Sequence, residues 1–88
     1  MEKLTLHVIG RFRRLAGGED IEGFDNLYEV DGMPPNNYCV VGYAGMRDNE
    51  RRWGVSWYRS GERVNLLSED TYTSTEKALE AIARALVN

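Results

Sequence analysis

The C-terminal segment carries the clearest periodic pattern of apolar residues in the chain. These residues recur every three or four positions, at Ala78, Leu79, Ile82, Ala85 and Leu86. Such spacing places one apolar stripe along a helix. Thr73 and Glu76 precede the stripe with the spacing of a capping box, in which two side chains satisfy free backbone N–H groups at the start of a helix. The pattern predicts a helix over about residues 74–87.

Three runs before this helix have the composition of β-strands. They are rich in valine and aromatic residues and cover residues 38–46, 52–59 and 63–67. Ser60-Gly61, between the last two runs, suits a two-residue hairpin turn. This turn places Trp57 opposite Val64 and leaves Ser56, Tyr58, Arg63 and Asn65 on the other face. Val55 then lies opposite Leu66, and the helix is expected to cover this apolar side.

The pairing of the first two runs follows from a turn through residues 47–51. We expect Met46 opposite Trp53, because Trp57 then lies over Gly42, where the missing side chain leaves room for an indole ring. The same pairing directs three side chains to the outer face of the sheet, away from the helix: Cys39, Val41 and Tyr43.

The N-terminal third is less decisive. Residues 3–16 fit both a strand and a helix, and Thr5, Val8, Ile9 and Gly10 favour the strand because β-branched residues and glycine are poor helix formers. The sequence also predicts a short strand over residues 27–30. The sequence therefore predicts an α+β fold: a small antiparallel sheet of about four strands with a C-terminal helix packed on one face, in a single domain over residues 1–88.

The composition is that of an ordinary globular domain. The chain has 88 residues, 42% hydrophobic and 28% charged. No run approaches the roughly 18 apolar residues of a membrane-spanning helix, and the N-terminus does not resemble a secretory signal. A single cysteine, Cys39, excludes an internal disulfide framework and fits a reducing compartment. We therefore expect a cytoplasmic protein.

The net charge of −3 conceals an uneven distribution. Residues 19–37 contain six acidic residues and no basic one. The simplest interpretation is a solvated loop. The alternatives are a contact with a basic partner, through a secondary acidic patch, or with the chain's own Arg11, Arg13 and Arg14. The patch consists of Glu19, Asp20, Glu22 and Asp25.

The residue patterns of common catalytic and metal sites are largely missing from the sequence. The only histidine, His7, stands in a predicted strand with no nucleophile nearby. One cysteine and one histidine do not supply the ligands of a zinc site. The acidic stretch contains too few apolar residues to raise a carboxyl pKa for acid–base catalysis. The sequence predicts no catalytic activity, no metal and no cofactor.

Residues 46–63 favour binding instead. They combine five arginines, two tryptophans and a tyrosine, the residue types that most often carry binding energy at interfaces. The leading hypothesis is a protein that binds another protein as an inhibitor or adaptor, for example a phage or mobile-element inhibitor of a host system. The predicted contact residues are Tyr43, Arg51, Arg52, Tyr58, Arg59, Arg63 and Asn65.

Two alternatives stay open. The hairpin arginines could bind nucleic acid, or an open sheet edge could pair with a second copy of the chain in a homodimer. The stretch from Trp53 to Leu86 faintly resembles the arm-type DNA-binding modules of phage-type tyrosine recombinases, through Trp57-Tyr58, Gly61 and the helix entry at Tyr72, Thr73, Glu76 and Ala78. That resemblance implies DNA binding. Such modules are rich in lysine, however, and this chain has two lysines.

Overall fold

The computed structural model describes residues 3–16 and 19–87, with the backbone alone for residues 12–24. Its elements confirm the α+β class and raise the strand number from about four to six. The strands are β1 (Thr5–Ala16), β2 (Glu19–Asp31), β3 (Asn37–Arg47), β4 (Glu50–Arg59), β5 (Glu62–Val64) and β6 (Thr71–Tyr72), and the helix is α1 (Thr75–Val87).

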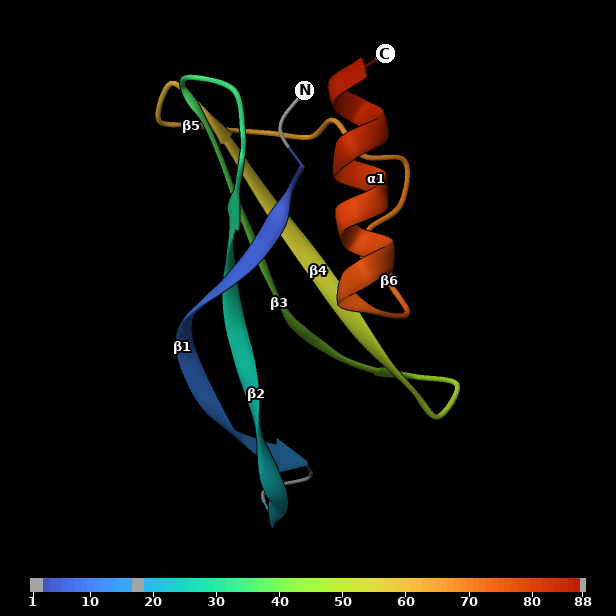
Figure 1. The fold of residues 1–88 in the computed structure, drawn as a ribbon. Helices are drawn as coiled ribbons and strands as arrows, with labels where there is room; N and C mark the ends of the chain where they lie inside the picture. Colours follow the sequence, from blue (N-terminus) through green and yellow to red (C-terminus); the bar gives the residue numbers. More distant parts are fainter. Residues whose placement is uncertain (1–2, 17–18, 88) are drawn as a thin grey trace.

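The strands form one antiparallel sheet in the order β1-β2-β3-β4-β5, and the two-residue β6 pairs with β4. Strands β2 and β3 pair at Tyr28–Val41 and Glu29–Val40. Beyond these pairs the β1–β2 and β3–β4 hairpins diverge, and α1 lies along the half of the sheet away from both hairpin tips (Figure 1). The helix therefore leaves the distal half of the hairpins uncovered on its own side.

The core lies between α1 and the sheet. Trp57 and Val41 from the sheet, and Ala78 and Ile82 from α1, are buried together, and Tyr72 of β6 completes the layer. Because side chains alternate between the faces of a strand, the neighbours of these sheet residues point to the opposite face. We call that opposite side the outer face.

The predicted helix is confirmed, but its cap differs from the expected one. The hydroxyl of Ser74 accepts a hydrogen bond from the Lys77 backbone N–H at 3.1 Å. Ser74 thus serves as the N-cap directly before the first helical residue, in place of the predicted pair Thr73 and Glu76. One turn from the helix end, Glu80 and Arg84 form an ion pair at 3.7 Å.

The β4–β5 hairpin has the predicted turn and register. Ser60 and Gly61 both have positive φ, 51° and 83°, as a type I′ turn requires, and Trp57 lies opposite Val64. The predicted Val55–Leu66 pair is wrong, because β5 ends at Val64 and Leu66 is 41% exposed. Leu67 packs against the core instead.

The predicted register of the β3–β4 hairpin is wrong. Asp48 and Asn49 form a two-residue turn, with φ of 52° and 65°, and the register shifts between Tyr43 and Met46. Gly45 lies in this shift with φ of 101°. As a result Tyr43 lies opposite Trp53, and the parity of β3 is reversed from the predicted one.

The reversal moves three side chains from the outer face to the helix side. Cys39 and Val41 are fully buried there, opposite Trp57 and Val55, and Tyr43 joins them. The space over Gly42 is taken by Leu27 and not by Trp57: a Cβ on Gly42 would lie 3.2 Å from Leu27 Cδ1.

The N-terminal third forms a long hairpin. Residues 3–16 contribute a strand, as favoured, and the acidic stretch is also a strand, not a loop. The predicted strand over residues 27–30 is the end of the longer β2. Within the described residues, no helix combines the length and the apolar character needed to cross a lipid bilayer.

Candidate functional site

The first candidate site lies on the helix side, where the two hairpins diverge. Tyr43 and Trp53 face each other across β3 and β4 with their ring centroids 5.9 Å apart, in an edge-on arrangement. Tyr28 of β2 lies 6.3 Å from the same indole. All three rings are half-buried. With Arg51, which alternation places on the same face as Trp53, they form what we call the splay surface.

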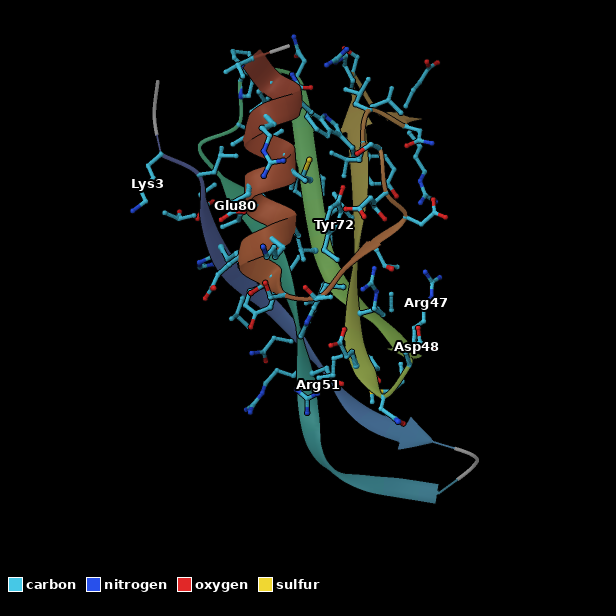
Figure 2. The ribbon with its side chains drawn as sticks, turned by 90° about the vertical axis from the view of Figure 1, so that its right-hand side faces the viewer. Lys3, Arg47, Asp48, Arg51, Tyr72 and Glu80 are labelled. Carbon is cyan, nitrogen blue, oxygen red and sulfur yellow. The ribbon has the colours of Figure 1, made fainter. Side chains whose placement is uncertain are left out.

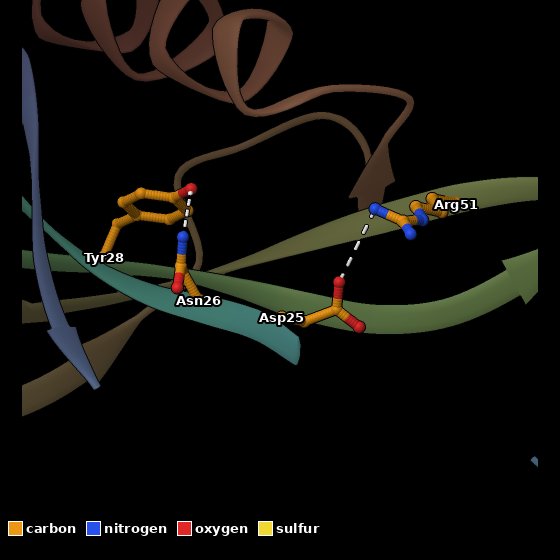
Figure 3. A network of polar contacts seen from close by, with 4 residues as sticks. All are labelled: Asp25, Asn26, Tyr28 and Arg51. Atoms are coloured by element: carbon orange, nitrogen blue, oxygen red, sulfur yellow. Dashed lines mark hydrogen bonds and ion pairs between the residues drawn. The ribbon is translucent and has the colours of Figure 1, made fainter. Parts of the chain in front are cut away.

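Two neighbouring residues of β2 position the polar groups of this surface (Figure 3). Asn26 donates a hydrogen bond from Nδ2 to the Tyr28 hydroxyl at 3.1 Å. Asp25 is 3% exposed and pairs with Arg51, Oδ1 to Nη1, at 3.7 Å, while the Arg51 side chain is 46% exposed. A buried carboxylate therefore orients a half-exposed guanidinium.

The second candidate site is on the outer face. Tyr38, Tyr58 and Arg63 form one row across β3, β4 and β5. The two tyrosine rings lie 6.3 Å apart, Tyr38 is 41% exposed, and Arg63 is exposed. The predicted placement of Tyr58 and Arg63 on this face is confirmed, and the exposed Asn65 follows β5.

Two of the predicted contact residues also make hydrogen bonds within the fold. Arg52 donates from Nε to the Thr71 hydroxyl at 2.9 Å and from Nη2 to the Thr71 carbonyl at 2.8 Å, which fastens β6 to β4. Arg59 donates from Nε to Asn37 Oδ1 at 3.1 Å. The same oxygen accepts the indole N–H of Trp57 at 3.0 Å.

The structure describes only one side chain of the predicted acidic patch, that of Asp25. Asp25 does not face a partner, because it is buried against Arg51. Glu19, Asp20 and Glu22 have side chains that lie outside the described residues. Asp25 thus pairs with one of the chain's own arginines, on β4. The side chains of Arg13 and Arg14, which were predicted for that role, lie outside the described residues.

A third feature is a groove between residues 66–69 and α1, with a volume of about 400 Å³. Tyr72 contributes to its floor, between the helix and the sheet (Figure 2), and is 6% exposed. Its hydroxyl makes no hydrogen bond with any described residue. Burial and the Glu69 carboxylate raise the pKa of Tyr72, against the opposing effects of the Glu69 amide and Arg84.

The remaining reactive group is Cys39. Its side chain is fully buried, and burial raises its pKa from 9.0 to about 12. Within the described ranges, no three His, Cys, Asp or Glu side chains come close enough together to hold a metal ion.

Comparison with protein-family models, curated proteins and solved structures finds no match to this chain. Sequence reasoning missed Tyr28 and Tyr38 as members of these two aromatic groups, and it did not pair Trp53 with Tyr43. The signal that could have revealed them is the pair Asp48-Asn49, since both residue types tolerate positive φ and so permit a two-residue turn.

Proposed function

We propose that this chain is a protein-binding module that attaches to another protein through the splay surface. The observation that carries the proposal is the grouping of Tyr43, Trp53 and Arg51 on the helix-side face where the hairpins diverge: the two rings are half-buried and Arg51 is exposed. Trp53 also packs against the edge of the core. Tyrosine, tryptophan and arginine dominate the binding energy of protein interfaces when they lie together in a central patch.

The arrangement of these groups also favours binding. The Trp53 ring packs between Tyr28 and Tyr43, and the Asn26 amide fixes the Tyr28 hydroxyl. Arg51 is oriented by a carboxylate. Side chains already held in one arrangement lose less conformational entropy when a partner binds. The surface is therefore suited to a partner with an apolar centre and an acidic or carbonyl group facing Arg51.

A module of this kind acts by occupying its partner's surface, as an inhibitor or an adaptor. We extend the proposal to a phage or mobile-element inhibitor of a host system in the cytoplasm, an extension that rests on the small size of the domain and its single cysteine. Protein is favoured over nucleic acid because Arg52 and Arg59 are engaged within the fold, so fewer arginines face a phosphate backbone.

Comparative affinity capture tests the proposal. The wild-type chain, a Tyr43→Ala/Arg51→Lys variant and an outer-face control, Tyr58→Ala, are used as baits in lysate of the native cells, with and without nuclease. We expect one protein to be retained by wild type and control and lost by the double variant, independently of nuclease.

Arg51→Lys keeps the charge beside Asp25 but removes the planar, bidentate donor, so folding should be preserved, which a thermal melt checks. Equal retention by all three baits would contradict the proposal. Retention that disappears with nuclease would favour the nucleic-acid hypothesis.

A further inference from the structure

The outer face carries opposite charges on its two sides. On β2, Glu29 and Asp31 point to this face, since Glu29 pairs with Val40 and Asp31 follows two residues later. On β5, Arg63 pairs with Tyr58. None of these three charged residues forms an ion pair with a described residue. His7, opposite Glu29 on β1, borders the acidic side.

The charges are separated by an aromatic centre. Continuing the β2–β3 pairing by two residues brings Asp31 level with Tyr38, so one row runs from Asp31 through Tyr38 and Tyr58 to Arg63. The row crosses three strand intervals, or about 14 Å. Its middle is the tyrosine pair, in which Tyr38 is exposed and Tyr58 is half-buried. The single helix of the described part of the chain, α1, lies on the opposite side of the sheet (Figure 1).

We propose that this outer face packs against the outer face of a second copy of the chain, in a two-fold symmetric dimer. An axis parallel to the strands, midway between β3 and β4, lays β5 of each copy over β2 of the other. Arg63 then meets Asp31 of the second copy, and the reverse contact follows by symmetry. The tyrosine pairs meet at the axis.

The dimensions fit this arrangement. Sheets that pack face to face with nearly aligned strands lie about 10 Å apart, a distance that tyrosine rings and an arginine–aspartate pair can fill. A different protein would need an acid and a base at the same spacing around an apolar centre, whereas a second copy presents both by symmetry. The dimer uses the face opposite the splay surface and goes beyond the proposed function.

Charge exchange tests the dimer. Sedimentation velocity is measured on wild type, Arg63→Glu, Asp31→Lys and an equimolar mixture of the two variants, up to about 1 mM, where weak complexes assemble. Thermal melts confirm that each variant is folded. Arg63→Lys serves as the conservative control, because it retains the sign of the charge.

We expect wild type and Arg63→Lys to show a dimer and each reversal variant to sediment as a monomer. The mixture should recover the dimer, since each reversed charge again meets its opposite in the mixed pair. A monomeric wild type at every concentration, unchanged association in the reversal variants, or a mixture that stays monomeric would each overturn the proposal.

Discussion

Replacing Tyr72 by phenylalanine should stabilise this protein. Tyr72 is 6% exposed, and its hydroxyl lacks a hydrogen-bonding partner among the described residues. The Glu69 backbone N–H lowers the pKa of Tyr72, but it does not reach the hydroxyl oxygen with hydrogen-bond geometry, and no described group accepts the hydroxyl proton. Phenylalanine keeps the ring that packs against α1 and removes only the polar atom.

The expected gain follows from the cost of an unpaired buried polar group, about 1–3 kcal/mol. The small void left by the hydroxyl reduces it, so we expect a net gain of about 1 kcal/mol in the free energy of unfolding. For a domain of this size that raises Tm by about 4–8 °C. The matched control, Tyr58→Phe on the outer face, should change stability by less than about 0.5 kcal/mol.

The pH dependence of stability gives an independent test of the environment of Tyr72. The pKa of Tyr72 is raised above 10.0 in the folded state. As pH rises through 10.0, the unfolded chain loses its proton first, so the wild type loses stability there and the variant does not. Circular dichroism melts at neutral and alkaline pH should show the advantage of Tyr72→Phe increasing above pH 10.0. A variant less stable than wild type by about 1 kcal/mol would refute the reasoning, because it would reveal a satisfied hydroxyl.

Further predictions concern two backbone turns and the thiol. Gly32→Ala should destabilise the fold by more than about 2 kcal/mol, since φ is 94° and the new Cβ would lie 2.9 Å from the Lys3 carbonyl oxygen. Gly61→Ala, with positive φ but no atom within 4 Å, should cost only about 1 kcal/mol; equal urea-unfolding losses would contradict this contrast. Cys39 should react with Ellman's reagent at neutral pH only after unfolding, and rapid reaction in the folded chain would show that the β3 register is wrong.

The parts of the fold that the sequence predicts well are set by local signals. The apolar spacing of Ala78, Ile82 and Leu86 defines α1 whatever it packs against. Ser60-Gly61 permits only a tight turn, and this fixes Trp57 opposite Val64. In both places one short stretch determines the conformation, and so the prediction needs no knowledge of the rest of the molecule.

The predicted register of β3 was wrong because both faces of the strand are apolar enough to be buried. Its register depends on the turn at Asp48-Asn49 and on the irregularity at Gly45. A pairing error of three residues reverses the parity of the strand. That error placed Tyr43 and Cys39 on the wrong face, and it concealed the grouping of Tyr43 with Trp53.

The prediction of a loop for the acidic stretch was wrong for a different reason. A run of carboxylates with few apolar residues is typical of a solvated loop, yet the run pairs along β1 as a strand, with two shifts of register. The burial of Asp25 beside Arg51 joins two hairpins far apart in the sequence. No local pattern encodes such a contact, because it depends on how the two hairpins are arranged in the folded sheet.

Hydroxyl-radical footprinting with the captured partner tests the central proposal most directly, because the radical labels exposed tyrosine and tryptophan side chains that mass spectrometry can locate individually. We predict that the partner lowers the oxidation of Tyr43 and Trp53 several-fold and leaves Tyr38 and Tyr58 unchanged at a fixed chain concentration. Protection of Tyr38 and Tyr58, with Tyr43 and Trp53 labelled as in the free chain, would show that the partner binds the outer face and would contradict the assignment of the splay surface.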